Sequence, residues 1–518
     1  MNRIAVISVS LLLSAGFCFA KMKASLAGPF QLGSVLKPLS TVSMSTAEIS
    51  AFMPDKNTLF VVGNAKVVEV VDLNNPGLPK KIAEKAIPGN ASSVTVFGDL
   101  VAVSMLEDEE WKEGQVQVMR YADSLEVLGL YKVCNQPDMI KFTPDGKNLL
   151  VACEGSPSLD FAEDPEGGVA ILSVAEPSNG ELWKNAEMTV ARFDALDTTA
   201  LKAAGVRSPG VQGLVRSLEP EYITVSEDSK WAWVSLQENN AIAKVNISAK
   251  KVVDVFPLGY VDHSKAGFAL DAVSNGQIEI KNYPLRGLRQ PDGIASFTAG
   301  GRTFVLTANE GAPVNDYKAW TDVTTPMMLT EQNRLDRKVF TDSLLTELRE
   351  LSVSALERCD VGKNRTATGA CPYMYTFGSR SMSIFDGESG KLIWDSGELF
   401  ERAVAKIAPE HFNWNSKKNK VKMDKRSSDK GSEPENVTVG EVGKRRYAFV
   451  GLERTSGVAV IDITEPIAPK LVDYYLDPLD RGPEGILFIP AEKSPVSGQA
   501  LLVVGYEYSK TLTIYTVK

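Results

Sequence analysis

Histidine is scarce in this chain, with only His263 and His411 among 518 residues. The scarcity disfavours zinc sites, Ser-His-Asp triads and phosphatase centres that need several imidazole ligands. The sequence also lacks a nucleophile elbow, a Walker loop, a dinucleotide fingerprint and a zinc motif. After the first 20 residues no run of about 18 apolar residues follows, so no transmembrane segment is predicted. Carboxylates and arginines are therefore the main candidate functional groups.

Positive charge is in deficit, with 56 Lys and Arg against 65 Asp and Glu and a net charge of −9 at pH 7. The acidic residues are spread along the whole sequence. Such a surface repels nucleic-acid phosphates and anionic lipid headgroups. We therefore expect no nucleic-acid partner.

The N-terminus has the layout of a secretory signal. Arg3 precedes an apolar run from Ile4 to Phe17, and small residues lead to Ala20. We expect cleavage near Ala20, a periplasmic or secreted mature protein, and one domain over residues 21–518.

Five cysteines are present, and Cys18 lies in the expected signal. The remaining four form an even set in an exported chain, which predicts disulfides. Short sequence separations favour Cys134 with Cys153 and Cys359 with Cys371. We expect the first bridge to join the two ends of one hairpin. The alternative is buried free thiols.

A pattern of two β-rich runs joined by a turn, the second run ending in an acidic or amide residue, recurs seven times, for example as PDMIKFTPDGKNLLVACE and PENVTVGEVGKRRYAFVGLE. The apolar marker residues of the first runs are Ile49, Val94, Ile140, Ile223, Ile294, Val437 and Ile486. Spacings of 45, 46 and 49 residues match one four-stranded blade, as in WD40-like repeats, and longer spacings indicate insertions. The sequence predicts an all-β, seven-bladed β-propeller. Stacked sandwich domains are the alternative.

The chain ends on a third-strand run, TLTIYTVK, so the last blade needs a fourth strand. We expect residues 25–45 to supply it, beside the blade that contains Tyr515. A first insertion, about residues 311–377 in blade 5, carries the apolar-spaced stretch FTDSLLTELRELSVSALERC and is expected to form helix and cap one face. A second, about 400–433, is rich in Lys, Asn and Ser and predicts a solvated loop.

Acidic or amide residues mark one end of every predicted hairpin. The second runs end at Asn64, Glu107, Glu154, Glu238, Glu310, Glu453 and Glu507, and five first runs begin with Pro and an acid, at Asp138, Glu221, Asp292, Glu435 and Glu484. In an antiparallel hairpin the start of the first strand and the end of the second lie together. We therefore expect a carboxylate rim around one mouth of a central channel.

Crowded carboxylates repel one another unless a cation offsets their charge, and oxygen-only ligands select hard ions. Ca²⁺ is the expected cofactor, with Mg²⁺ or Mn²⁺ as alternatives. The loop EGSPSLDFAEDPEGG adds further acids that could wrap one ion. The predicted metal ligands are Asp138, Glu154, Asp160, Asp164, Asp292, Glu310, Glu435, Glu453 and Glu484. The alternative is that these acids cap strand ends and surface turns.

Arg380 and Arg454 lie beside the expected rim and are candidates for binding an anionic group through two hydrogen bonds. The alternative is that both arginines pair with carboxylates.

Several segments, including YTFGSRSMSIFDGESGKLIWDSGELFE, SSDKGSEPENVTVGEVGKRRYAFVGLERTSGVAVIDITEP and RGPEGILFIPAEKSP, resemble the choice-of-anchor I family, which includes a cell-surface glycoprotein of biomineralising animals. The resemblance covers most of the mature chain. It implies a secreted or surface-held propeller, linked to calcium in animal members, with no established catalytic role in bacterial ones. Where the family has acidic EGEP or EGD loops, this chain has EGSP and EGAP.

Two functions follow from these patterns. The first is a secreted, calcium-associated, non-enzymatic binding or scaffold protein whose acidic face meets a protein, a glycan or a phosphorylated ligand. The alternative is a calcium-dependent phosphoesterase of the phytase or alkaline-phosphatase kind. No motif identifies a general base, so catalytic residues are not assigned.

Overall fold

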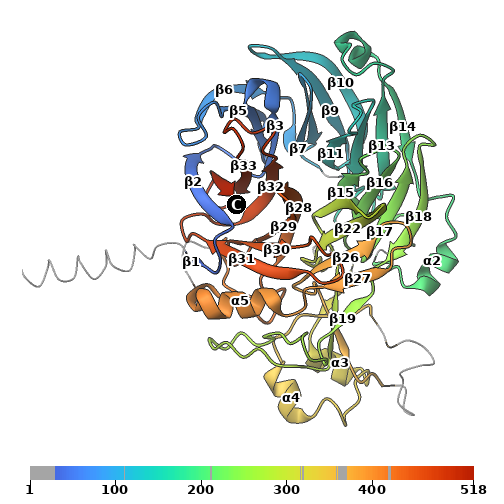
Figure 1. Ribbon diagram of the computed structural model, residues 1–518. Helices are drawn as coiled ribbons and strands as arrows, with labels where there is room; N and C mark the ends of the chain where they lie inside the picture. The colour runs from blue at the N-terminus through green and yellow to red at the C-terminus, as the bar shows by residue number, and fades with distance from the viewer. Residues whose placement is uncertain are drawn as a thin grey trace, which may run out of the picture.

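The computed structural model describes residues 30–518 except 110, 210–212, 316, 318–319, 358, 360–369 and 418–421. The expected signal at residues 1–20 lies outside them. Antiparallel sheets dominate the described residues, and helices are few and short (Figure 1). No helix among them is long and apolar enough to cross a membrane. The predicted all-β class is confirmed.

Four sheets are built from four consecutive antiparallel strands each. The strands are β3 (Ile49–Met53), β4 (Thr58–Val62), β5 (Val67–Asp72) and β6 (Lys80–Ala86); β7 (Asn90–Phe97), β8 (Leu100–Leu106), β9 (Glu113–Tyr121) and β10 (Leu125–Asn135); β11 (Pro137–Phe142), β12 (Asn148–Cys153), β13 (Gly168–Ser173) and β14 (Glu187–Ala191); and β15 (Pro220–Val225), β16 (Trp231–Leu236), β17 (Ala241–Asn246) and β18 (Lys251–Pro257).

Three further sheets include strands that are distant in sequence. They contain β21 (Ile294–Ala299), β22 (Arg302–Ala308), β26 (Met382–Asp386) and β27 (Leu392–Asp395); β28 (Pro434–Val442), β29 (Arg445–Leu452), β30 (Gly457–Asp462), β31 (Lys470–Leu476) and β1 (Phe30–Gln31); and β32 (Pro483–Ile489), β33 (Ala500–Tyr506), β34 (Thr511–Val517) and β2 (Leu36–Ser43).

The seven first strands surround one axis. Each contacts the next in the order β3, β7, β11, β15, β21, β28 and β32, and β32 contacts β3. Residues from all seven line a common cavity of about 370 Å³. Every marker residue of the sequence repeat lies in one of these strands. Buried Val, Ile and Leu side chains of adjacent sheets pack between them and form the core.

The N-terminal segment completes the last sheet. β2 pairs antiparallel with β34, and Pro38 lies opposite Tyr515, which confirms the strand predicted from residues 25–45 within its described part. Figure 1 shows the blue β2 beside the red C-terminal strands. β1 pairs with the edge of the preceding sheet, at β31.

The buried Asp473 of β31 fixes the turn between β1 and β2. Its carboxylate accepts hydrogen bonds from the backbone N–H groups of Gly33 at 2.7 Å, Val35 at 2.8 Å and Leu36 at 2.9 Å. The Gln31 side chain donates a fourth at 3.0 Å. Four donors to one ionised acceptor compensate for burying its charge.

Residues between β22 and β26 form a small unit with its own core. It contains α3 (Pro326–Glu331), α4 (Asp342–Glu347), β23 (Val323–Thr324), β24 (Val353–Ser354) and β25 (Met374–Thr376), and β25 pairs with β20 (Leu285–Leu288), which pairs with β19 (Tyr260–Asp262). Leu329, Phe340 and Leu351 pack there on Tyr283 and Leu285. The predicted helix is shorter than its apolar pattern suggested, because α4 ends at Glu347.

The remaining helical segments of the described chain are α2 (Thr198–Ala204), α5 (Leu399–Ile407) and the 3-10 turns η1 (Pro54–Lys56), η2 (Gly180–Lys184) and η3 (Pro409–His411).

The prediction of a solvated loop over residues 400–433 is wrong within its described part, which excludes residues 418–421. Helix α5 packs Phe400 and Val404 against the sheet that contains β30 and β31. Further along, Phe412 and Trp414 are buried and Glu433 has no exposed surface. Polar composition suggested solvent, but some of these polar groups are buried and bonded to one another, as where Asn413 donates to Glu401 at 3.2 Å and to Ser427 at 2.9 Å.

Both predicted disulfides are present. Cys134 and Cys153 are bonded with Cα atoms 5.7 Å apart, and Cys359 is bonded to Cys371. The first bridge does not join the ends of one hairpin, as predicted, because β10 continues to Asn135 and carries Cys134. It therefore ties β10 of one sheet to β12 of the next.

Substitution of Asp473 tests whether the N-terminal turn holds the ring together. Asp473→Asn replaces one ionised acceptor oxygen by a donor facing backbone N–H groups, so we expect the free energy of unfolding to fall by about 2–3 kcal/mol. Chemical denaturation measures it. The exposed Asp123→Asn should change stability by less than about 0.5 kcal/mol. Equal stability of the two variants would show that this turn contributes nothing to closure.

Candidate metal site

Eight carboxylates line one cavity at the end of the central axis. The cavity has a volume of about 350 Å³, and no Lys, Arg or His side chain lies among its lining residues. The carboxylates belong to Glu48, Asp138, Glu154, Glu221, Asp292, Glu310, Glu435 and Glu484. We call this space the acid cavity. It contains six of the nine predicted metal ligands.

Local strand geometry places the acids there. In four sheets the proline that opens the first strand pairs with the last residue of the second, for example Pro137 with Cys153 and Pro434 with Leu452. The register shifts within the next three residues, so an extra residue bulges from the first strand. A bulge re-aims its side chains. The acid that follows each proline, such as Asp138 or Glu435, thus lines the acid cavity.

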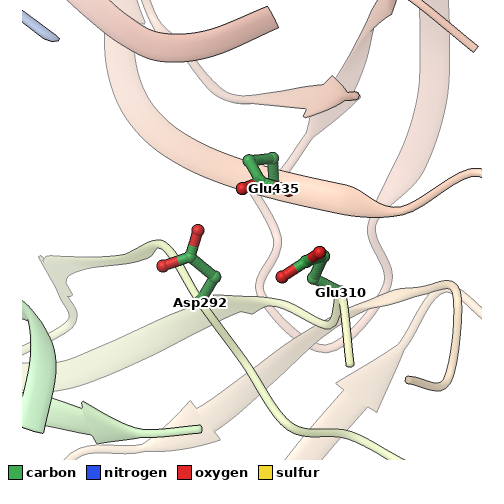
Figure 2. A group of neighbouring side chains, drawn as sticks. All are labelled: Asp292, Glu310 and Glu435. Carbon is green, nitrogen blue, oxygen red and sulfur yellow. The ribbon is translucent and has the colours of Figure 1, made fainter. Parts of the chain in front are cut away.

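Asp292, Glu310 and Glu435 form the tightest open group. One oxygen atom from each lies within 4.8 Å of the others. Figure 2 shows the three side chains pointing toward one another, with Asp292 before β21, Glu310 after β22 and Glu435 within β28. The Gln237 side chain donates to Glu310 at 2.8 Å, whereas one oxygen of Glu435, Oε2, has no hydrogen-bond partner among the described residues. This group can offer oxygen ligands to one hard cation.

The electrostatics of the acid cavity favour a bound positive charge. Burial, then the neighbouring Glu310, raises the pKa of both Asp292 and Glu435 well above the usual range. Burial raises the pKa of Asp138 to about 6. Burial and the neighbouring Glu507 raise the pKa of Glu48 to about 7. Each shift records the cost of holding negative charge among other carboxylates away from bulk water.

A second carboxylate group already contains cations. Oxygens of Glu310, Glu433 and Glu453 also lie within 4.8 Å of one another. Glu433 bonds with Arg426 at 2.5 Å and with Lys430 and Arg454 at 3.1 Å. Burial raises the pKa of Glu433, but Lys430, Arg426 and Arg454 outweigh it, so the pKa falls to about 2. Glu453, a predicted ligand, therefore lies in a group neutralised by the protein itself.

The acidic loop after Glu154 does not wrap a common position. Asp160 is exposed and accepts bonds from Ser158 at 2.9 Å and from the backbone N–H of Ala162 at 3.1 Å. Asp164 lies beside Arg216 and Glu166. Neither Asp160 nor Asp164 lines the acid cavity, which only Glu154 of this loop reaches. Within this loop Asp160 serves a local turn, and Glu166 pairs with Arg216 outside it.

Arg380 is not available to bind an anion, contrary to the prediction. Its side chain is 4% exposed and donates to Glu401 and to the backbone oxygens of Asp271, Ser427 and Asp429 at 2.6–3.0 Å. Arg454 pairs with Glu433 and Glu453 and donates to the Tyr508 hydroxyl. Both arginines pair with carboxylates, which was the alternative.

Three residues of this region escaped the sequence prediction of ligands. Glu221 carries the same Pro-acid signal as the others, and its side chain is 8% exposed with one oxygen, Oε2, unpartnered in the described structure. Glu48 does not follow a proline. It lies one residue before its marker Ile49, whereas the predicted first-strand acids lie two residues before theirs. Lys430 contacts Glu310 from the segment that was predicted to be solvated.

Comparison with known proteins identifies a matching family model and two relatives that align with parts of this chain. A family model described as the choice-of-anchor I domain matches residues 48–466. The mesenchyme-specific cell surface glycoprotein of Strongylocentrotus purpuratus is 30% identical over 319 residues, which cover 54% of this chain and 39% of that protein. Gigasin-3a of Magallana gigas is 27% identical over 191 residues, or 33% of this chain and 65% of that protein. The chain thus spans less than two thirds of the length of either relative.

Solved structures with a similar arrangement are distant in sequence. Hydrazine synthase of Kuenenia stuttgartiensis has a TM-score of 0.45 at 13% identity and covers 91% of this chain and 96% of that chain. The Cps50 (Swd1) β-propeller domain of Myceliophteria thermophila has a TM-score of 0.47 at 9% identity and covers 93% of this chain and 100% of that chain.

The raised pKa of Glu48 predicts a pH-dependent effect of its removal. A carboxyl whose pKa is raised by folding stabilises the folded state below its unfolded pKa, and that contribution is lost as pH rises toward about 7. Glu48→Gln should therefore become progressively more stable relative to the parent between pH 5 and pH 8 in the presence of chelator. Denaturant midpoints at each pH measure this difference. The exposed Glu126→Gln should give a difference independent of pH, and parallel curves for Glu48→Gln would refute the expectation.

Proposed function

Because the chain belongs to the choice-of-anchor I domain family, we propose that it is a secreted or periplasmic, non-enzymatic binding protein that holds Ca²⁺ in the acid cavity of a seven-bladed β-propeller. The observation that carries the proposal is the convergence of eight carboxylates on a cavity lined by no basic residue.

The seven-bladed arrangement is supported by the sheets themselves. Seven sheets of four or five strands follow one another along the chain, and their first strands contact in one closed order. Pairing of β2 with β34 joins the two ends of the chain in the last sheet. Radial repetition of blades in a propeller leaves only short, protected sheet edges.

Calcium is favoured over other ions by the ligand set. Carboxylate oxygens suit hard cations, and Ca²⁺ accepts irregular cages of six to eight oxygens better than Mg²⁺ does. Asp292, Glu310 and Glu435 supply the nearest oxygens, while Asp138, Glu221 and Glu484 add negative charge to the same cavity. Water or oxygens of a bound partner would complete the coordination. The partner expected there is a protein, a glycan or a phosphorylated ligand.

Export is supported by three independent features. The sequence begins with a pattern typical of a secretory signal, and the described chain contains two disulfides, which persist in oxidising compartments. One relative is named a cell surface glycoprotein. We therefore propose that the mature protein acts outside the cytoplasm.

The phosphoesterase alternative has no observation in its favour. Both candidate anion ligands, Arg380 and Arg454, are engaged with carboxylates or backbone oxygens. A phosphate that entered the acid cavity would meet eight carboxylates and no basic side chain, so bound cations would be required to hold it.

Calcium should stabilise the folded protein. A ligand that binds only the folded state stabilises it by about 2.7 kcal/mol at 100 times its Kd, so calcium should raise the melting temperature and chelator should reverse the rise. Asp292→Asn combined with Glu435→Gln removes two charges and keeps the side-chain shapes. This variant should melt higher than the parent in chelator and lose most of the calcium response.

A matched control is Glu126→Gln combined with Glu465→Gln, which removes the same charge from exposed positions. It should respond to calcium like the parent. A parent melting curve that calcium leaves unchanged would refute the cation site. Calcium-dependent release of phosphate from a phosphomonoester would refute the non-enzymatic part of the proposal.

A further inference from the structure

Lys430 is a cation supplied by the chain itself at the edge of the acid cavity. Its side chain is 11% exposed. The ammonium pairs with Glu310, donates to the backbone oxygen of Gly311 at 2.8 Å and lies 3.1 Å from Glu433. Glu310 belongs to both carboxylate groups, the open one with Asp292 and Glu435 and the neutralised one. Lys430 therefore touches a carboxylate that the cation site also uses.

Glu433 has two cationic partners besides Lys430. Arg426 donates to one oxygen of Glu433 at 2.6 Å, and Arg454 donates to the other at 3.1 Å. Two guanidinium groups already satisfy this buried carboxylate. Glu310 is different, because its other described partner is the neutral amide of Gln237. Lys430 is thus one of three cations beside Glu433 and the cationic partner that Glu310 has in the described structure.

Arg380 fixes the backbone that carries Lys430. It donates to the carbonyl oxygens of Ser427 and Asp429, on the N-terminal side of Lys430, and is itself held by Glu401. On the other side, Gly431 has a φ of +68°, and a Cβ there would lie 2.6 Å from the Arg380 side chain. Close packing of Arg380 on this turn therefore keeps the ammonium directed at Glu310.

We propose that Lys430 is an intramolecular competitor that lowers the affinity of the acid cavity for divalent cations by pairing with Glu310. This inference rests on the proposed function, because it assumes that a divalent cation binds beside Asp292, Glu310 and Glu435. Arg380 is a positioning residue in this arrangement. A divalent ion that approaches Glu310 must share it with the ammonium or displace it, and like charges in one cavity repel.

Calcium titration of Lys430→Met separates competition from a structural role. Methionine keeps most of the side-chain length and removes the charge, so the variant should bind calcium at least about tenfold more tightly, a typical coupling between neighbouring charged sites. Its melting temperature in chelator should fall, since Glu310 loses its partner, while its calcium-induced rise should exceed that of the parent. Isothermal titration calorimetry and melting curves measure both quantities.

Lys430→Arg is the matched control, because it retains the charge and should bind calcium within about threefold of the parent. Lys430→Gln, which retains a hydrogen-bond donor, replaces the methionine variant if that chain does not fold, and it should also bind more tightly. If the parent binds calcium and the uncharged variants bind it equally well or more weakly, this inference is wrong and the proposed function stands. Absence of calcium binding in parent and variants alike would overturn both.

Discussion

The arrangement of seven first strands around one axis determines most of what is distinctive in this molecule. Because each strand contacts its neighbours in the ring, the starts of all seven meet at one end of the axis. A bulge after the opening proline in four sheets then turns an acidic residue into the space where the strands meet. The ring of first strands thus brings the carboxylates close together. This crowding, together with burial, raises the pKa values of Asp292 and Glu435.

Two neighbouring groups of crowded carboxylates differ in the cations that the chain places beside them. Around Glu433 the chain supplies three cations, and the buried carboxylate stays ionised, with a pKa of about 2. Around Asp292 and Glu435 it supplies none directly, and the carboxyls hold protons more tightly than usual. Glu310 belongs to both environments. The contrast favours the group with Asp292 and Glu435 over the group with Glu433 as the proposed cation site.

Sequence patterns predicted the features that depend on residues close together in the sequence, and they failed for features that depend on packing between distant segments. The repeat located all seven first strands, and hairpin geometry brought Asp138, Glu310 and Glu435 to one cavity. It also indicated the strand that β2 adds to the last sheet. These successes share one cause, since register within a hairpin depends on residues close in sequence.

The errors come from contacts between distant segments. Nothing near Arg380 in the sequence reveals that its partners lie at Asp271, Glu401 and Ser427. The polar composition of residues 400–433 suggested solvent, whereas the same polar groups bond to one another inside the protein. Acid spacing alone does not distinguish a metal loop from a turn such as the one at Asp160, whose carboxylate accepts local hydrogen bonds and does not line the acid cavity.

Pairing of β2 with β34 also determines when the molecule can finish folding. Strand Leu36–Ser43 pairs with strand Thr511–Val517 across most of the described sequence, with Thr41 and Thr513 separated by 472 residues. Long-range pairing of this kind slows folding, because loop-closure entropy is lost before contacts compensate for it. Sheets made of consecutive strands need no such distant partner, so pairing of β2 with β34 is expected to be among the last steps of folding.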